Sequence, residues 1–148
     1  MSTFLITGAS KGIGKQMAIE LAQKNKTLVL VARNQALLDE LVEHLAQYKC
    51  PVYAIAYDVT NFDGYEQLLQ RATRMAGPID TLVLNAGILY KNAIGKGFKD
   101  DKATVDTNLL GPMAFIHAFV SYASEIDHPH VVVVSSICLL YTSPSPRD

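Results

Sequence analysis

The stretch TGASKGIG, residues 7–14, follows a short apolar run and precedes a segment with helical periodicity. Glycines at Gly8, Gly12 and Gly14 let the backbone turn tightly and approach a bound group closely. Three glycines alone are weak evidence, but a position between a strand and a helix is where such a loop holds a pyrophosphate at a helix N-terminus. The stretch therefore predicts a dinucleotide-binding turn, with a purely structural glycine turn as the alternative.

Short apolar runs and helical stripes alternate outward from this turn. The predicted strands cover residues 4–6, 28–31, 52–56, 81–84 and 131–134. Three predicted helices begin after residue 12 and after the cap candidates Asn34 and Asn61, and a fourth covers the span from about Asp101 to Ser124. The runs show little alternation of apolar and polar residues, which is typical of strands covered by helices on both faces. Repeated strand, helix, strand order predicts an α/β fold with a doubly wound parallel sheet of five strands.

Composition limits the classes of partner. The chain has 148 residues, with 13 Lys and Arg against 14 Asp and Glu, and a formal net charge of −1. This length fits one domain. Charged residues make up 18% of the chain, and the balanced charge gives no electrostatic case for binding nucleic acid or an anionic membrane.

The cysteines, histidines and N-terminus favour a metal-free cytoplasmic protein. Cys50 and Cys138 are too few and too far apart for a disulfide framework or a zinc site. The four histidines show no complete metal-ligand spacing. No run of apolar residues reaches the length of a membrane span, and the first residues lack the pattern of a signal peptide. We therefore predict no bound metal, no membrane segment and a cytoplasmic location.

The end of the second predicted strand bears on the choice of cofactor. Sites for NAD usually place a carboxylate there to accept the ribose 2′-hydroxyl group, whereas a 2′-phosphate calls for arginine. Here the strand ends in Val31, Ala32 and Arg33, with no carboxylate. Arg33 can bind a phosphate through its planar guanidinium, and Lys11 adds a second cation. NADP is therefore predicted over NAD, with two solvated surface charges as the alternative reading.

These residues resemble the classical short-chain dehydrogenase/reductase family over residues 1 to about 137. Its Thr-Gly-x-x-x-Gly-x-Gly motif is matched by residues 7–14, its Asn-Asn-Ala-Gly motif by Leu84 to Gly87 without the first Asn, and its adenine-contacting pair by Asp58 and Val59. The resemblance implies a Rossmann-type domain holding five of the family's strands. It also implies NAD(P)-dependent hydride transfer between nicotinamide and a small-molecule alcohol or carbonyl. The expected cofactor-binding residues are Thr7, Gly8, Ser10, Lys11, Gly12, Ile13, Gly14, Arg33, Asn34, Asp58, Val59, Asn85, Ala86 and Gly87.

Two catalytic positions follow from the same resemblance. Asn108 resembles the family's catalytic asparagine, and Ser136 resembles its substrate-orienting serine. Pro112 has no N–H group and cannot donate the usual helical hydrogen bond to the carbonyl of Asn108. The carbonyl is thereby left free for water, as in the family, where this oxygen anchors a proton-relay water. The alternative is that Asn108 and Pro112 merely mark a helix kink.

The last residues depart from the family pattern. The resemblance implies a Tyr-x-x-x-Lys pair after Ser136, but Tyr141 is followed four positions later by Ser145. Residues 142–147 contain two prolines and no apolar stripe. We expect residues 138–148 to be a non-native tail read from a sequencing adapter, with the domain ending at residue 137. This gives a second hypothesis, that the chain is a non-catalytic nucleotide-binding fragment of a parent protein. The resemblance implies a homo-oligomer for the intact parent.

Overall fold

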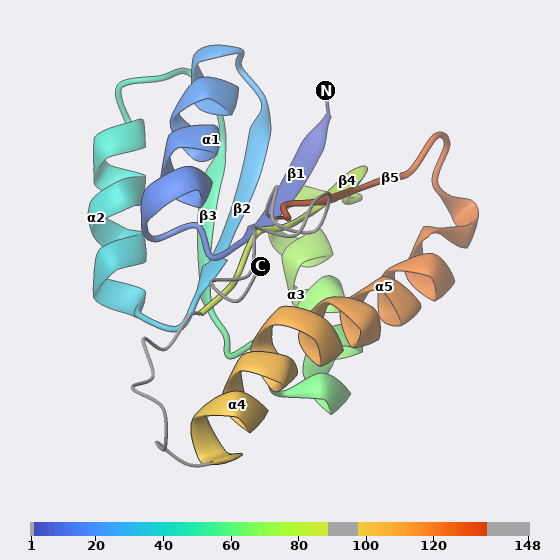
Figure 1. Ribbon diagram of the computed structural model, residues 1–148. Helices are drawn as coiled ribbons and strands as arrows, with labels where there is room; N and C mark the ends of the chain where they lie inside the picture. Colours follow the sequence, from blue (N-terminus) through green and yellow to red (C-terminus); the bar gives the residue numbers. More distant parts are fainter. Residues whose placement is uncertain (1, 89–97, 136–148) are drawn as a thin grey trace, which may run out of the picture.

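The computed structural model describes residues 2–88 and 98–135. Within them five parallel strands form one sheet in the order β3-β2-β1-β4-β5 (Figure 1). The strands are β1 (Thr3–Thr7), β2 (Thr27–Ala32), β3 (Val52–Ala56), β4 (Thr81–Leu84) and β5 (His130–Val133). The doubly wound parallel sheet predicted from the alternating pattern is confirmed. The ends of β1, β2 and β5 differ from the predicted ends by one residue, and β3 and β4 have the predicted bounds.

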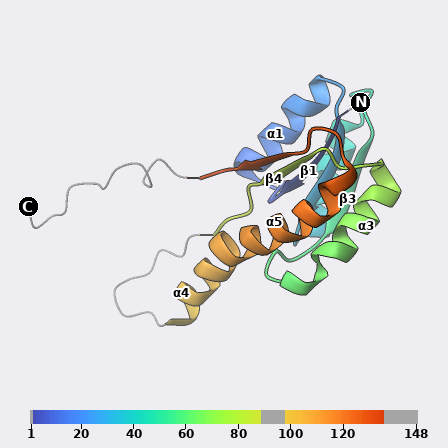
Figure 2. The same cartoon turned by 90° about the vertical axis from the view of Figure 1, so that its right-hand side faces the viewer.

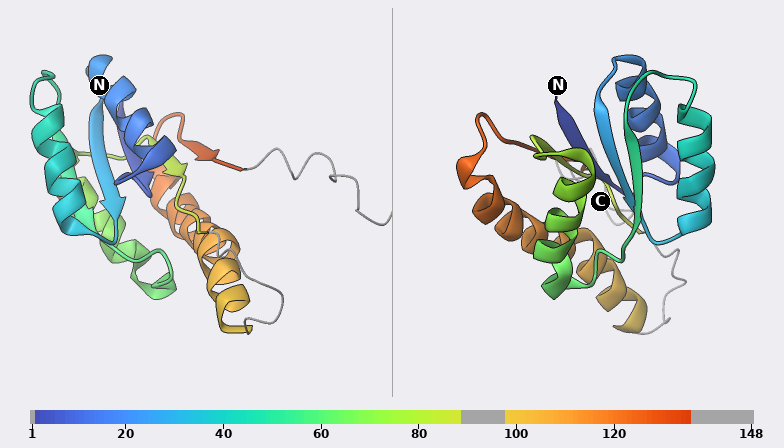
Figure 3. Two further views of the ribbon diagram at one scale, coloured as in Figure 1. Left: turned by 60° about the vertical axis from the view of Figure 1, so that its left-hand side comes forward. Right: turned by 180° about the vertical axis from the view of Figure 1, so that it is seen from behind.

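Helices cover both faces of the sheet. One face carries α1 (Gly12–Gln23) and α2 (Gln35–Leu45), and the opposite face carries α3 (Tyr65–Ala76) and α5 (Gly111–Tyr122), as Figure 2 and the two views of Figure 3 show. The remaining helical segments are η1 (Phe62–Gly64), α4 (Phe98–Val105), η2 (Asp106–Leu110) and η3 (Ala123–Glu125). In residues 2–88 and 98–135, no helix combines the length and the apolar character that crossing a membrane requires.

Alternate residues of each central strand enter two separate cores. Leu5 of β1 and Leu82 of β4 pack toward α3 and α5, together with Phe115 and Phe119. Ile6 of β1 belongs to the second core, toward α1 and α2. Both faces of the sheet bury apolar side chains, so the central strands are apolar at successive positions and show no alternation with polar residues.

The pairing of β1 with β4 joins distant parts of the chain. Phe4 lies opposite Thr81 in this parallel pair. At its start the backbone N–H of Thr3 donates to the Asp80 carboxylate at 2.6 Å, and the Asp80 N–H donates to the Thr3 carbonyl at 3.1 Å. The order of strands therefore reverses between β1 and β4, which is the point at which open α/β sheets form a ligand crevice.

The helix predicted over about 101–124 is interrupted by a π-helical turn. α4 leads into η2, a π-helix, and then into α5. The N–H of Gly111 donates to the carbonyl of Asp106, five residues earlier. Because Pro112 has no N–H, the α-helical hydrogen bond is lost at the next residue, and the wider turn is tolerated there. From the sequence we considered a helix kink at Asn108 and Pro112, and the structure has a π-helical turn at this place.

The apolar residues at helical spacing in α1 are only partly buried. Ala18 and Ala22 of α1 are buried as the periodicity predicts, but Ile13 is 62% exposed. Ile13 stands in the first turn of α1 and lines a cavity that is described below. Ile13 has the spacing of the apolar helix face but does not belong to the core.

We expect Phe115→Ala to lower the free energy of unfolding by about 3–5 kcal/mol, because it empties a fully buried aromatic site. Phe115 is 0% exposed and its ring stacks on Tyr65 with centroids 4.2 Å apart. Phe98→Ala is the matched control, because Phe98 is 80% exposed and its removal leaves no cavity. Urea unfolding of both variants measures the difference, and equal losses would contradict this core assignment.

Candidate cofactor site

A cavity of about 510 Å³ lies at the carboxyl ends of four strands. Gly8 follows β1, Arg33 follows β2, Asp58 lies just after β3 and Asn85 follows β4. The cavity thus opens at the reversal of strand order. Its other lining residues are Ser10, Lys11, Gly12, Ile13, Ala32, Asn34, Leu37, Tyr57, Val59, Ala86, Gly87, Ile88 and Thr107.

The structure brings most of the predicted cofactor-binding residues to this one cavity. All of them line it except Thr7 and Gly14, which lie behind its wall and shape the turn. Five lining residues were not among the predicted cofactor-binding residues, namely Ala32, Leu37, Tyr57, Ile88 and Thr107. Tyr57 directly precedes the predicted pair Asp58 and Val59, and this adjacency could have indicated that it lines the cavity. The sequence gives no comparable signal for Leu37.

The glycine turn leaves no room for side chains at two of its positions. A Cβ atom on Gly14 would lie 2.4 Å from the carbonyl oxygen of Gly8 and 2.5 Å from Nδ2 of Asn85. Gly8 has φ +65°, and a Cβ atom there would lie 2.8 Å from Cα of Ala86. Gly12 also has positive φ, +53°, but faces open space. Close packing therefore requires glycine at two positions and backbone conformation favours it at Gly12.

Thr7 and Asn85 lock the β1 and β4 ends together. The buried Thr7 hydroxyl accepts hydrogen bonds from the N–H groups of Asn85 at 3.0 Å and Ala86 at 3.1 Å, and it donates to the carbonyl of Val83 at 3.3 Å. The Asn85 amide donates to the carbonyls of Thr7 and Gly8, at 3.2 Å each. These bonds cross between the two strand ends, so they fix the floor of the cavity.

Two cations stand on the rim of the cavity. Lys11 and Arg33 are both exposed, and neither forms an ion pair with a carboxylate in the part of the chain that the structure describes. Asn34 follows directly and caps α2, its Oδ1 accepting from the N–H of Leu37 at 3.1 Å. This confirms the N-cap predicted at Asn34 and holds the start of α2 against the rim.

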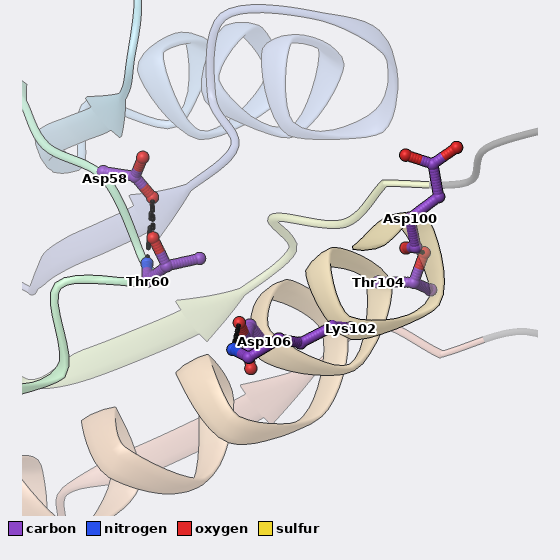
Figure 4. A network of polar contacts seen from close by, with 6 residues as sticks. All are labelled: Asp58, Thr60, Asp100, Lys102, Thr104 and Asp106. Carbon is purple, nitrogen blue, oxygen red and sulfur yellow. Dashed lines mark hydrogen bonds and ion pairs between the residues drawn. The ribbon is translucent and has the colours of Figure 1, made fainter. Parts of the chain in front are cut away.

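The carboxylate of Asp58 is held in a tight turn. Its Oδ1 accepts from the Thr60 N–H at 2.9 Å and from the Thr60 hydroxyl at 2.8 Å (Figure 4). Both bonds use the same oxygen, so the side chain is oriented while Oδ2 is not used by them. No group of three His, Cys, Asp or Glu side chains able to hold a metal occurs within residues 2–88 and 98–135.

Asn108 lies on the π-helical turn, with its side chain engaged at both ends. Its Oδ1 accepts from the Ile88 N–H at 2.8 Å, and its Nδ2 donates to the Ile88 carbonyl at 2.7 Å. The side chain thus joins the turn to the segment that follows β4. In the same helical region Lys102 pairs with Asp106 (Figure 4). Ser136 and the tail predicted at residues 138–148 lie outside the described residues.

The comparisons with known proteins give the family. A family profile described as short chain dehydrogenase matches residues 2–145. The chain belongs to the short chain dehydrogenase family. The relatives of this chain include an uncharacterized oxidoreductase of Listeria monocytogenes, 30% identical over 95% of this chain and 57% of the relative. Dehydrogenase/reductase SDR family member 7B of Bos taurus is 31% identical over 90% of this chain and 43% of the relative.

A solved structure shows the same likeness in three dimensions. An alcohol dehydrogenase from the archaeon Thermococcus sibiricus, complexed with 5-hydroxy-NADP, is 28% identical and superposes with a TM-score of 0.84. The superposition covers 92% of the chain described here and 58% of the Thermococcus sibiricus chain. The chain spans about half the length of the curated relatives it matches. The family and its Rossmann-type fold are therefore established for the residues compared.

Burial raises the pKa of two tyrosines next to the cavity. The pKa of Tyr57 rises to about 12, first through burial and then through the negative charges of Asp58 and Asp63. Burial, Tyr57 and Asp58 raise the pKa of Tyr65 well above its usual value. Both phenols therefore stay protonated at a pH at which an exposed tyrosine, with a pKa near 10, has ionised.

We expect the free energy of unfolding to fall as pH rises from about 10 to 12. In that window the unfolded chain releases phenolic protons that the folded chain keeps at Tyr57 and Tyr65, so the unfolded state binds fewer protons and stability decreases with pH. Urea unfolding at a series of alkaline pH values measures this slope, and Tyr65→Phe should make it shallower. An unchanged slope in that variant would show that other groups dominate.

Gly14→Ala should destabilise the fold by about 1–3 kcal/mol, the usual range for overpacking, although alanine favours a helix. The added methyl group would collide with Gly8 backbone and the Asn85 amide. Gly12→Ala is the control, because it meets open space and suffers only from its positive φ. Thermal unfolding compares the two variants. A larger loss at Gly12 would show that backbone conformation, rather than space, limits the turn.

Proposed function

We propose that this short chain dehydrogenase is an NADP-preferring oxidoreductase that transfers hydride between the nicotinamide and a small-molecule alcohol or carbonyl. The observation that supports it is the cavity at the reversal of strand order, with Lys11 and Arg33 on its rim. The activity of the whole protein belongs to this proposal, because the chain covers only about half of its relatives. A cytoplasmic location and a homo-oligomeric parent also stay predictions.

The turn between β1 and α1 suits a pyrophosphate. Gly12 leaves open space over the backbone, and Lys11, the N-cap of α1, makes no side-chain hydrogen bond to the first turn. The first N–H groups of α1 can therefore donate to phosphate oxygens, and the helix dipole favours negative charge at that end. The absence of side chains at Gly8 and Gly14 permits a close approach to Asn85, whose amide donates to the carbonyl of Gly8. A phosphate at this turn would therefore have a fixed position relative to β4.

The adenosine end of the cofactor fits the residues after β2 and β3. Arg33 and Lys11 would bind a ribose 2′-phosphate, because a guanidinium and an ammonium offer charged donors without a competing carboxylate. Asp58 would accept a hydrogen bond from the adenine amino group through Oδ2, since Oδ1 is used by Thr60. The Thermococcus sibiricus relative was solved with an NADP derivative, which supports this choice of cofactor over NAD.

The bound nicotinamide would accept or deliver the hydride. In this proposal Asn108 acts through its backbone, because both ends of its side chain are already bonded to Ile88. The α-helical hydrogen bond to its carbonyl is missing since Pro112 has no N–H, and this oxygen can hold a water that passes a proton. Ser136 would orient the substrate oxygen, a role that rests on the family resemblance.

Arg33→Ala should raise the Kd for NADPH by about 10- to 100-fold, since hydrogen bonds to charged groups contribute about 1.5–3 kcal/mol, and should leave the Kd for NADH nearly unchanged. The measurement is fluorescence titration of the full chain with each nucleotide. Arg71→Ala is the matched control, because Arg71 is exposed on α3 and does not line this cavity. Equal losses for NADPH and NADH would argue against a 2′-phosphate contact, and absence of binding by the unmodified chain would refute the proposed function.

A further inference from the structure

We propose that Tyr65 is a positioning residue for the cofactor, which acts by holding the peptide group between Val59 and Thr60 and, through it, the carboxylate of Asp58. The inference rests on the proposed cofactor function, because it concerns the wall that would face the adenine. Tyr65 does not line the 510 Å³ cavity itself. Its effect on binding is therefore indirect.

The hydroxyl of Tyr65 is directed at one backbone oxygen. Tyr65 is the first residue of α3 and is only 1% exposed. Its hydroxyl donates to the carbonyl of Val59 at 2.6 Å, and this bond is buried. Val59 itself lines the cavity. A phenol in the core thus reaches the back of the cavity wall.

The same peptide group is held at its other edge by Asp58. The carbonyl of Val59 and the N–H of Thr60 belong to one planar trans peptide, so they point in opposite directions. The N–H donates to Oδ1 of Asp58 at 2.9 Å, while the carbonyl accepts from Tyr65 at 2.6 Å. Rotation of the peptide would break both bonds. Tyr65 therefore helps to keep the Asp58 carboxylate in its orientation.

Aromatic packing fixes the ring that carries this hydroxyl. Phe115 of α5 stacks on Tyr65, with centroids 4.2 Å apart and planes inclined by 17°. Tyr57 packs against Tyr65 at 5.4 Å and 41°. A ring held by two aromatic neighbours loses little further freedom when its hydroxyl forms a hydrogen bond. The donor is therefore preorganised.

The helix that follows Asn108 approaches the same carbonyl. A Cβ atom on Gly111 would lie 2.9 Å from the carbonyl oxygen of Val59 and 3.5 Å from the hydroxyl of Tyr65. Glycine thus lets the junction of η2 and α5 pack directly against this hydrogen bond. The carbonyl oxygen of Val59 is therefore the point at which the π-helical turn packs against the cavity wall.

The test compares two tyrosine-to-phenylalanine variants of the full chain. Tyr65→Phe removes only the hydroxyl at Val59, and the expected result is a rise of about 3- to 10-fold in the Kd for NADPH, the equivalent of one net hydrogen bond. Tyr122→Phe is the matched control. Its hydroxyl bonds to the Ile79 N–H at 2.9 Å and to Thr73 at 2.8 Å, and Tyr122 does not line the cavity. We expect it to lower Tm and to change the Kd less than 2-fold.

Each variant is titrated with NADPH to measure the Kd, and its thermal unfolding is followed to measure Tm. A Kd for Tyr65→Phe equal to that of the unmodified chain, or an equal loss of affinity in Tyr122→Phe, would overturn the positioning role and leave the proposed function intact. If the unmodified chain does not bind NADPH, the proposed function fails and this role fails with it. If Tyr65→Phe does not fold, Gly111→Ala decides, because its methyl group presses on the same carbonyl: weakened binding supports the role, and unchanged binding overturns it.

Discussion

The side-by-side placement of β1 and β4 is the constraint on which the cavity depends. The two strands are distant in sequence, and the Thr7 hydroxyl and the Asn85 amide bind across their carboxyl ends. Without this pairing the glycine turn would have no opposite wall, since Asn85, Ala86 and Gly87 all follow β4. Because Gly8 and Gly14 have no Cβ atom, the loop after β1 can approach the loop after β4 closely. The chemistry proposed for the site therefore begins with a packing requirement.

Local patterns in the sequence were sufficient to predict the fold. Each strand is a short apolar run, and the cap at Asn34 and the turn at residues 7–14 depend on neighbours a few positions away. The predicted positions around the cavity also come from strand ends, which gather at one edge of a parallel sheet whatever the details of packing. For this reason most of the predicted cofactor residues line one cavity, while their contacts with a cofactor stay predictions.

Contacts between distant segments were not predictable from one sequence. The double hydrogen bond of Asn108 to Ile88 and the bond of Tyr65 to Val59 depend on how α3 and α5 pack on the sheet. In the sequence, Tyr65 stands at helical spacing with Leu68, Leu69 and Ala72. This spacing predicts that the ring is buried, but it gives no partner for the hydroxyl. The π-helical turn was not predicted either, because Pro112 indicated a helix kink but not the wider hydrogen-bonding pattern of a π-helix.

The strand order also has a consequence for the kinetics of folding. β1, β2 and β3 pair with their neighbours in sequence, whereas β4 must return past them to pair with β1, and the bond from Thr3 to Asp80 closes a loop of 77 residues. Closing a loop of this length costs chain entropy before contacts offset it. We therefore expect β1 to β3 to pair first and β4 to dock in a later step. Because the cavity is lined by residues that follow β1, β2, β3 and β4, it can form only after β4 has paired with β1.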